Sequence, residues 1–211
     1  TQNQAFSALL FLYRDVLRHD LESIEAFVRA RRPKRLPVVL TRREVRAVLA
    51  NLDGTAWLVV SLLYGSGLRL MEALRLRVKD VDFSYRQINL RDGKGRRDRV
   101  TILPNRVGEP LRRHLAHVRV LFQRDVDEGI GRARLPYALE RKFPSAASTW
   151  SWQFIFPGRR PSTDPLTGEI CRHHLHESAI RRTLQPAVRR AGLTKRVTSH
   201  SFRHRFATHL L

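Results

Sequence analysis

The stretch YGSGLRLMEALRLRVKDVDF, residues 64–83, decides the fold because it connects a buried helix to the start of a sheet. The apolar run before it, residues 57–63, predicts the buried helix, and Gly65-Ser66-Gly67 predicts its end. Apolar residues then recur at helical spacing over residues 68–76, which predicts a second, short helix. From residue 81 onward the period changes to that of strands. A glycine-rich turn therefore places Arg69 at the head of the short helix.

The rest of the chain predicts an α+β fold that is mainly helical and carries a small antiparallel sheet. Residues 87–90 and 99–103 alternate as strands, and Asp92-Gly93-Lys94-Gly95 between them predicts a hairpin turn. The other predicted helices span residues 1–32, a segment from the capping box at Thr41 and Glu44 to about residue 51, residues 107–125, 175–191 and 200–211.

Changes in composition predict the domain boundaries. Residues 1–32 are expected to be the C-terminal part of an earlier helical domain, because their helical pattern opens without a cap. Residues 33–40 hold two prolines and predict a basic linker, and residues 41–211 form a second domain that stops inside its last helix. Within it, the aromatic and proline-rich residues 129–168 predict a compact insertion with its own small core.

The charge of the chain points to an anionic partner. The 211 residues carry 40 Lys+Arg and 19 Asp+Glu, a formal net charge of +21 that repels itself unless an anion relieves it. The basic residues gather at residues 29–46 and 170–211, and in the first block we expect Lys34 and Arg35 to contact phosphates. A basic surface of no particular function is the alternative. An anionic membrane fits less well, since no basic amphipathic helix stands apart.

Several classes of protein are excluded by what the sequence lacks. A single cysteine, Cys171, excludes a disulfide framework, and no apolar run is long enough to span a bilayer. The start shows no signal peptide, so a soluble cytoplasmic protein is expected. Histidines gather at residues 173–209 with Glu177 as the acid among them, which does not predict a metal site. No phosphate loop ending in Gly-Lys-Ser/Thr is present, so no cofactor is expected.

Three places combine basic side chains with a constrained backbone. Arg69 follows the glycine turn, and its planar fork suits two phosphate oxygens. Lys94 stands at the hairpin tip, where it could reach a groove. His200 and Arg203 are three residues apart at a helix start, so they project from one face. Each has a plain alternative: a surface arginine at a helix joint, a solvated turn lysine, and surface residues of a basic helix.

Taken together, the Gly-Leu-Arg turn at Arg69, the Gly-Lys-Gly at Lys94 and His200-x-x-Arg203 resemble the catalytic domain of the tyrosine recombinases, the phage integrase family. Residues 64–83 and TSHSFRHRFATHLL, residues 198–211, carry the resemblance, which covers about residues 36–211. Residues 1–32 resemble the end of the family's helical core-binding domain.

The resemblance implies a mechanism that needs no metal or cofactor. A tyrosine attacks the scissile phosphodiester of DNA and forms a 3′-phosphotyrosyl link. Arg69 and Arg203 would hold the non-bridging oxygens, and Lys94 would protonate the leaving 5′-oxygen. His200 would assist proton transfer, and Glu72 would orient a neighbouring basic group.

The insertion narrows the resemblance to the integron integrases. ALERKFPSAASTWSWQFIFPG, residues 138–158, followed by STDPLTGEICRHHLHES, residues 162–178, is similar to the extra segment of that subgroup. Its members recombine gene cassettes at folded single-stranded attC hairpins and at a duplex attI site. The resemblance implies that an extrahelical base is held by Trp152, Pro165 and His173, with His174 beside them. The alternative is that Trp150 and Trp152 both pack the insertion; we expect Trp150 to pack inward.

One departure from the family concerns the nucleophile. It should follow the His200-x-x-Arg203 helix, whereas the tyrosines stand at positions 13, 64, 85 and 137, with Tyr64 expected to be buried. The chain is therefore expected to be truncated, and to bind DNA without cutting it. The resemblance further implies a bacterial, nucleoid-associated protein that forms a tetramer on DNA. A non-catalytic DNA-binding relative and a basic RNA-binding protein remain as rival hypotheses.

Overall fold

A computed structural model describes residues 2–19, 38–91, 98–136, 139–165 and 167–209. The chain divides into two compact units, Thr1–Leu36 and Pro37–Leu211, and each is described by itself. The division lies within residues 33–40, the segment that the sequence predicts as a linker. Lys34, Arg35 and Lys94 lie outside the described residues, so their roles stay predictions.

The first unit shows that a continuous helix over residues 1–32 is a wrong prediction. Helix α1 (Gln2–Phe11) continues into the π-helical turn η1 (Leu12–Val16), and the chain then leaves the helix. Arg18 adopts a left-handed conformation with φ 51°, and the next N–H, that of His19, donates to the Tyr13 carbonyl at 2.9 Å. This closure satisfies a carbonyl at the helix end, as left-handed caps do. Residues 20–32 lie outside the described residues.

The second unit has the expected architecture, mainly helical with a small antiparallel sheet. Its strands β1 (Val81–Asp82), β2 (Gln87–Leu90) and β3 (Arg99–Ile102) lie in the order β1-β2-β3, with Leu90 opposite Arg99. The two predicted strands are confirmed, and β1 was not predicted. The principal helices are α2 (Arg42–Leu49), α3 (Gly54–Gly65), α4 (Leu70–Leu74), α5 (Asn105–Asp127), α7 (Glu177–Arg190) and α8 (Ser199–His209).

Local signals in the sequence fix several helix ends. Thr41 and Glu44 form the predicted capping box: the Thr41 N–H donates to Glu44 Oε2 at 2.7 Å, and the Glu44 N–H donates to Thr41 Oγ1 at 3.1 Å. At the other end of the chain, Gly192 follows α7 with φ +70°, which a side chain would disfavour.

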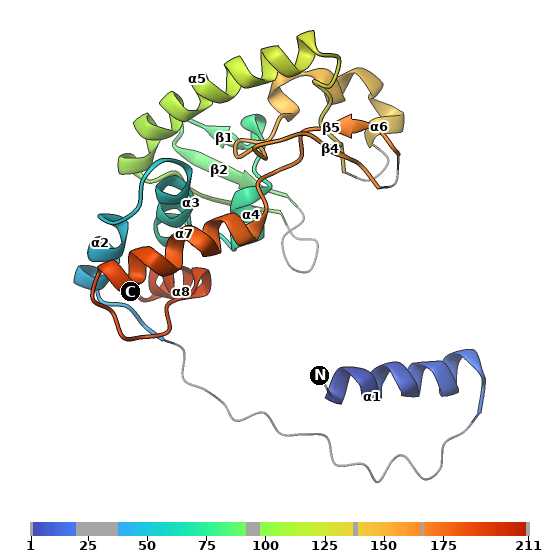
Figure 1. The fold of residues 1–211 in the computed structure, drawn as a ribbon, viewed down its shortest axis with the longest axis horizontal. Coiled ribbons are helices and arrows are strands. Elements are labelled where there is room, and N and C mark those ends of the chain that lie inside the picture. The colour runs from blue at the N-terminus through green and yellow to red at the C-terminus, as the bar shows by residue number, and fades with distance from the viewer. Residues whose placement is uncertain (1, 20–37, 92–97, 137–138, 166, 210–211) are drawn as a thin grey trace. The chain divides into compact units, whose positions relative to one another are not determined.

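Helix α3 is the centre of the core. Its residues from Leu58 to Leu63 are all buried, and it packs against α2, α4, α5, α7 and α8. Figure 1 shows α3 between the long helix α5 on one side and the pair α7 and α8 on the other. The sheet lies between α5 and α4.

The insertion contributes to the main core, while its residues Ala133, Leu135, Ala147 and Phe154 are buried outside that core, so a small core of its own stays a prediction. Ile155 and Phe156 are fully buried in the main core, and the Ile155 N–H donates to the Leu76 carbonyl at 2.9 Å. A buried ion pair joins the following segment to α5, with Arg172 Nε and Nη2 each 2.6 Å from a carboxylate oxygen of Asp125. The short elements of this region are α6 (Leu139–Lys142), η3 (Pro144–Ser148), η4 (Trp150–Trp152), β4 (Ser162–Thr163) and β5 (Ile170–Cys171).

The helices of the described residues do not include one that could span a membrane, since none is both long and apolar enough.

Candidate functional site

The glycine turn between α3 and α4 lies directly against α8. Gly67 has φ +63°, and a Cβ added there would stand 2.4 Å from Cδ1 of Phe206. No residue with a side chain fits this position without moving the ring. The close approach brings the first turns of α8 to the head of α4, and so brings Arg203 to Arg69, far apart in sequence.

Glu72 organises the head of α4. Arg69 precedes the helix, and its backbone N–H donates to Glu72 Oε2 at 2.7 Å. The Arg69 guanidinium folds onto the same carboxylate, with Nη1 2.5 Å from Oε1. A carboxylate at the first turn of a helix also satisfies a free backbone donor, as in a capping box. Glu72 therefore fixes both the backbone and the side chain of Arg69.

Two more guanidinium groups meet the same carboxylate. Arg99, the first residue of β3, donates from Nη2 to Glu72 Oε2 at 2.7 Å. Arg203 of α8 places Nη1 3.8 Å from Glu72 Oε2, an ion pair without a hydrogen bond. Among the described residues, this Nη1 is a buried donor that has no hydrogen-bond partner. We call Arg69, Glu72, Arg99 and Arg203 the arginine cluster.

The charges of the arginine cluster do not balance. Burial raises the pKa of Glu72, but the hydrogen bonds from Arg69 and the charge of Arg99 outweigh it and hold that pKa below its usual value. Burial lowers the pKa of Arg203, and the charges of Arg69 and Arg99 lower it further while Glu72 raises it. Three cations thus share one anion.

Such an arrangement suits an oxyanion with several oxygens. Guanidinium groups bind phosphate through pairs of parallel N–H donors, and a buried donor without a partner gains most when an acceptor arrives. The arginine cluster can therefore hold a phosphate group and stabilise additional negative charge on it.

The other two residues with predicted catalytic roles are not placed in the arginine cluster by the structure. His200 lies exposed on the first turn of α8, and its ring centroid is 6.5 Å from that of His204. Lys94 is outside the described residues. The structure therefore brings together Arg69, Glu72 and Arg203 of the predicted set.

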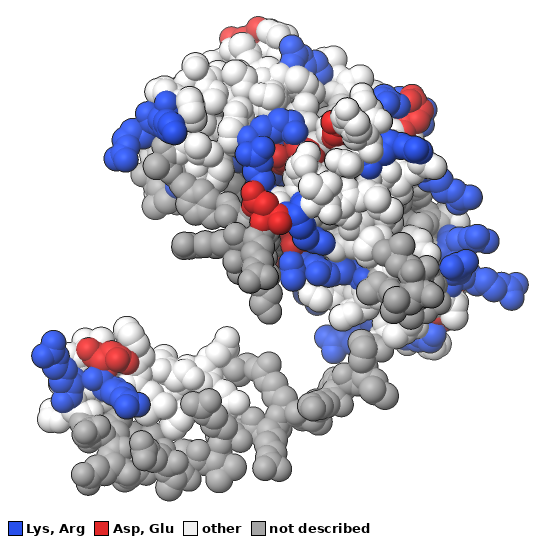
Figure 2. Space-filling model, turned by 180° about the vertical axis from the view of Figure 1, so that it is seen from behind, with Lys and Arg blue, Asp and Glu red and all other residues white. Residues whose placement is uncertain are grey.

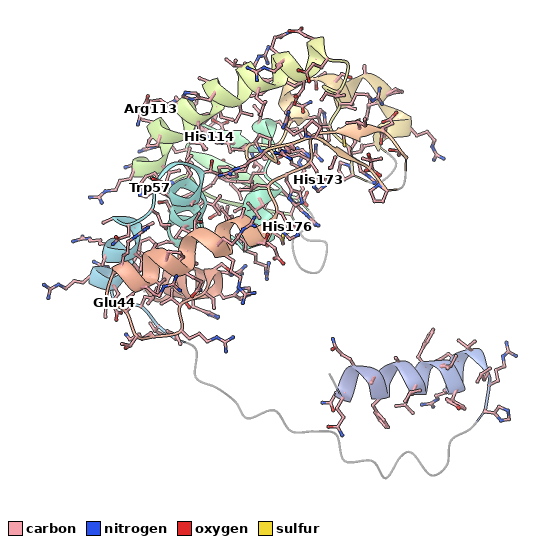
Figure 3. The ribbon with its side chains drawn as sticks, viewed as in Figure 1. Glu44, Trp57, Arg113, His114, His173 and His176 are labelled. Atoms are coloured by element: carbon pink, nitrogen blue, oxygen red, sulfur yellow. The ribbon has the colours of Figure 1, made fainter. Side chains whose placement is uncertain are left out.

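A second group of side chains lies beyond the other end of α4. The rings of His173 and His174 are tilted by 46° with centroids 4.0 Å apart, and both contact the buried ring of Phe154, at 5.3 and 5.4 Å. Trp152 is half-buried beside them, and Lys79 Nζ stands 2.8 Å from the centre of its ring. We call Trp152, Phe154, His173 and His174 the histidine–aromatic cluster; Figure 3 labels His173 before α7.

Arginines hold the histidine–aromatic cluster in place. Arg77 stacks over Phe154 at 4.4 Å and donates to the carbonyls of Trp152 and Arg134 at 2.6 and 2.7 Å. Burial lowers the pKa of Arg77 to about 10, and burial with the charge of Arg91 lowers the pKa of Lys79 to about 8.

The two histidines are held neutral. Burial lowers the pKa of His173, and the charges of His174 and Arg75 lower it further. Burial also lowers the pKa of His174. Arg75 is exposed and directly follows α4, and its charge acts on both histidines.

Trp150 is the tryptophan expected to pack inward, and Pro165 is the predicted base-site residue that is not part of the histidine–aromatic cluster. Trp150 packs inward as expected, with its ring 5.7 Å from that of Phe122 on α5. Pro165 lies exposed on the turn between β4 and β5.

A cavity of about 940 Å³ lies elsewhere, between α2, α3 and the start of α5. Tyr64 lines it and is half-buried, which corrects the expectation that Tyr64 is buried. Tyr85 lines the same cavity. In the part of the chain that the structure describes, no three His, Cys, Asp or Glu side chains are grouped so as to hold a metal ion.

Comparison with solved structures identifies the class of fold. The crystal structure of XerA recombinase matches with a TM-score of 0.56 and 24% identity, over 99% of this chain and 61% of that one. The Tn1549 transposon integrase in complex with transposon right end DNA matches with a TM-score of 0.57 and 18% identity, over 99% of this chain and 65% of that one. The second unit thus has the fold of a tyrosine recombinase catalytic domain.

Sequence comparison then identifies the family. Residues 38–211 match the model of the phage integrase family, and the chain belongs to that family of tyrosine recombinases. An integrase/recombinase of Escherichia coli is 44% identical over 211 residues, 100% of this chain and 63% of that protein. The tyrosine recombinase XerA of Thermococcus onnurineus is 34% identical over 182 residues, 85% of this chain and 50% of that protein. The chain therefore spans less than two thirds of the length of these relatives.

No role in a site was predicted from the sequence for Arg99 of the arginine cluster, or for Arg77 and Lys79 beside the histidine–aromatic cluster. Arg99 was assigned only to a strand, and Arg77 and Lys79 were assigned to no element, since they follow the helix predicted over residues 68–76. A signal for Arg99 does exist. Because side chains alternate along a strand, Arg99 and Thr101 lie on the same face of β3. They pair with Leu90 and Ile88 of β2, respectively.

Proposed function

We propose that the complete protein is a site-specific DNA recombinase that breaks and rejoins strands through a covalent phosphotyrosyl intermediate. One observation carries this proposal: Arg69, Arg99 and Arg203 surround Glu72, and Arg203 has a buried donor that finds no hydrogen-bond partner among the described residues. A phosphodiester in the arginine cluster would take up that donor and balance the excess of positive charge.

The proposed reaction exchanges one ester bond for another. The tyrosine oxygen forms a bond to phosphorus while the bond from phosphorus to the 5′-oxygen breaks. The phenol proton leaves with the assistance of His200, and Lys94 gives a proton to the 5′-oxygen. Arg69 and Arg203 bind the non-bridging oxygens, whose charge grows in the transition state. The 3′-phosphotyrosyl link keeps the energy of the broken bond, so no metal or nucleotide is required.

We propose that the nucleophilic tyrosine is supplied by residues of the complete recombinase that follow the α8 helix. Tyr64 and Tyr85 line the cavity beside α2 and α3, and Tyr13 belongs to the first unit. Tyr137 lies outside the described residues. We propose that the 211 residues by themselves bind DNA without cleaving it.

The histidine–aromatic cluster supports the narrower proposal that the substrate includes the folded single-stranded attC sites of gene cassettes, recombined with a duplex attI site. An extrahelical base needs a flat surface and nearby positive charge. Trp152 and His173 offer rings at the surface, and Arg75 and Lys79 offer the charge. Helix α4 has five residues, which is about 8 Å of helix, so a base and the scissile phosphate could be held at its two ends.

The proposal extends to the assembly. Residues 1–32 would be the end of a core-binding domain, with Lys34 and Arg35 of the linker on DNA phosphates, and four copies would assemble on paired sites at the bacterial nucleoid.

The central experiment incubates the complete recombinase with a hairpin cassette site that carries a nick near the scissile phosphate. A covalent protein–DNA adduct on a denaturing gel is expected. Arg69→Ala or Arg203→Ala should abolish the adduct and only weaken binding. Tight binding without any adduct would instead favour a non-catalytic DNA-binding relative, and a preference for RNA would contradict both.

A second experiment tests the histidine–aromatic cluster. Trp152→Ala should weaken binding to the folded single-stranded site by about 1–3 kcal/mol, the contribution of one base stacked on an aromatic ring, and affect the duplex site less. Trp150→Ala is the matched control for loss of packing. Equal losses at both sites would show that Trp152 only supports the fold.

A further inference from the structure

The position of Arg99 is fixed by more than its ion pair. Its strand, β3, pairs with β2, and Thr101 two residues later donates from Oγ1 to the Ser66 carbonyl at 2.8 Å. Arg99 and Thr101 thus both contact the segment from α3 to α4. Val100 and Ile102 between and after them are exposed. One face of β3 therefore contacts the glycine turn and the α4 helix that follows it.

Arg99 and Arg203 compete for one oxygen atom. Arg99 Nη2 is 2.7 Å from Glu72 Oε2, and Arg203 Nη1 is 3.8 Å from the same oxygen. This oxygen also accepts the backbone N–H of Arg69 at 2.7 Å. With two donors already in hydrogen-bond distance, Oε2 makes an ion pair but no hydrogen bond with Arg203, and Nη1 of Arg203 has no hydrogen-bond partner among the described residues.

We infer that Arg99 is a positioning residue that occupies Glu72 and thereby leaves Arg203 free to bind an anionic oxygen. Without Arg99, the Glu72 carboxylate would be stabilised most by moving closer to Arg203 and forming a hydrogen bond with its Nη1. A buried guanidinium paired with a buried carboxylate is a poor partner for a phosphate, because that pair would first have to be broken. The catalytic consequence rests on the proposed function; the competition for Glu72 does not.

The test separates positioning from direct contact with the anion. The 211-residue chain, labelled with ¹⁵N in its arginine side chains, is titrated with inorganic phosphate and the Arg203 signals are followed by NMR. Arg99→Ala should weaken phosphate binding about tenfold, equivalent to about 1.4 kcal/mol. Adding Glu72→Gln should restore binding to within about threefold, because a neutral amide does not capture Arg203. Arg99→Lys should restore part of the loss, since it keeps the charge.

Two results would overturn the inference. One is that Arg99→Ala binds phosphate as tightly as the unchanged chain. The other is that the double variant binds no better than Arg99→Ala, which is expected if Arg99 touches the anion itself. Arg113→Ala is the charge-matched control, since Arg113 lies on the outer side of α5 (Figure 3) and should leave phosphate binding unchanged.

The complete recombinase gives the corresponding kinetic test. Arg99→Ala should lower the rate of adduct formation about 100-fold, as a small displacement of a reacting group can do, with a smaller loss of DNA affinity. Glu72→Gln in the same chain should again recover part of the rate. If the unchanged recombinase forms no adduct, the proposed function fails, and the phosphate titration still decides the role of Arg99.

Discussion

Glu72 is the residue on which the arginine cluster depends. It is the one described carboxylate among three guanidinium groups, and it also binds the Arg69 N–H. Its negative charge offsets part of a repulsion that the fold would otherwise carry. The free energy of unfolding should therefore respond to this carboxylate more than to an exposed one.

Replacing Glu72 by Gln keeps the shape and removes the charge. We expect the free energy of unfolding in urea to fall by about 1–3 kcal/mol, because the hydrogen bonds lose the charge of their acceptor and the arginines repel one another without it. Glu109→Gln is the control, since Glu109 is exposed and its change should stay within about 0.5 kcal/mol. A fall no larger than that of the control would contradict the central role of Glu72.

The unfolding free energy should also depend on pH through Glu72. The pKa of Glu72 is lowered in the folded chain, so its contribution to stability is complete above the usual value of 4.5 and is lost as pH falls through the folded value. Glu72→Gln should flatten this part of the stability profile. Loss of stability with an unchanged acid profile would show that the carboxylate acts through packing alone.

The contact between Lys79 and Trp152 should also depend on pH. The pKa of Lys79 is lowered to about 8, so its ammonium should lose its proton near that pH and the cation–π contact with the indole should end. Because the pKa is 10.5 when unperturbed, the unfolded chain binds more protons between these values, and stability from this residue rises with pH there.

The expected signal is a change in Trp152 fluorescence with a midpoint at about pH 8. Lys79→Met should abolish this transition, and Trp152→Phe should remove the signal while Trp57 and Trp150 still report. A transition that survives Lys79→Met would assign the titration to another group.

At the scale of elements, the contact between the glycine turn and α8 holds the arginine cluster together. Gly67→Ala should push Phe206 and its helix away, since the new Cβ would stand 2.4 Å from the ring, and a left-handed alanine adds strain of about 1–2 kcal/mol. The unfolding free energy should fall by more than this strain. Phosphate binding should weaken with it, because Arg203 moves with α8.

Gly129→Ala supplies the matched control for backbone strain. Gly129 also has a positive φ, +76°, but an added Cβ there meets nothing within 4 Å. The unfolding free energy of Gly129→Ala should fall only by the cost of this backbone strain, and phosphate binding should stay unchanged. Equal effects of the two variants would mean that the contact between Gly67 and Phe206 contributes neither to stability nor to phosphate binding.

The elements that could be predicted are those with local causes. The capping box at Thr41, the apolar run of α3 and the alternation of β2 and β3 depend on neighbouring residues, and the structure confirms them. The break after Val16 has no such signal, because Leu17 continues the helical pattern while Arg18 turns left-handed. The share of the insertion in the main core also had no local signal, since the pattern of Ile155 and Phe156 fits a small separate core as well as the main one.

The candidate site was predictable where a motif names the residue. Arg69, Glu72 and Arg203 belong to motifs, and the fold brings them together. Arg99 does not, because its role arises from the pairing of β3 and the distance to one oxygen of Glu72. The strand pattern indicates only that Arg99 lies on the inner face of β3; the contact with Glu72 depends on how the strand packs against α4.

For the whole molecule, the net charge of +21 is the dominant quantity. Figure 2 shows Lys and Arg side chains over much of one face of the second unit, with fewer acidic ones among them. Some arginines are already neutralised, as Arg172 by Asp125 and Arg134 by Asp164. The charge that remains should release counterions when DNA binds, which makes affinity depend steeply on salt.

The salt dependence can locate the DNA surface. A plot of the logarithm of duplex affinity against the logarithm of salt concentration should have a negative slope of about 0.9 for each phosphate neutralised. Arg69→Ala and Arg203→Ala should each reduce the magnitude of the slope by about one, because each removes one phosphate contact. Arg113→Ala removes the same charge on the outer side of α5, beside Glu109, and should leave the slope unchanged. If Arg113→Ala changed the slope and the other two did not, DNA would bind across α5 and the arginine cluster would face away from it.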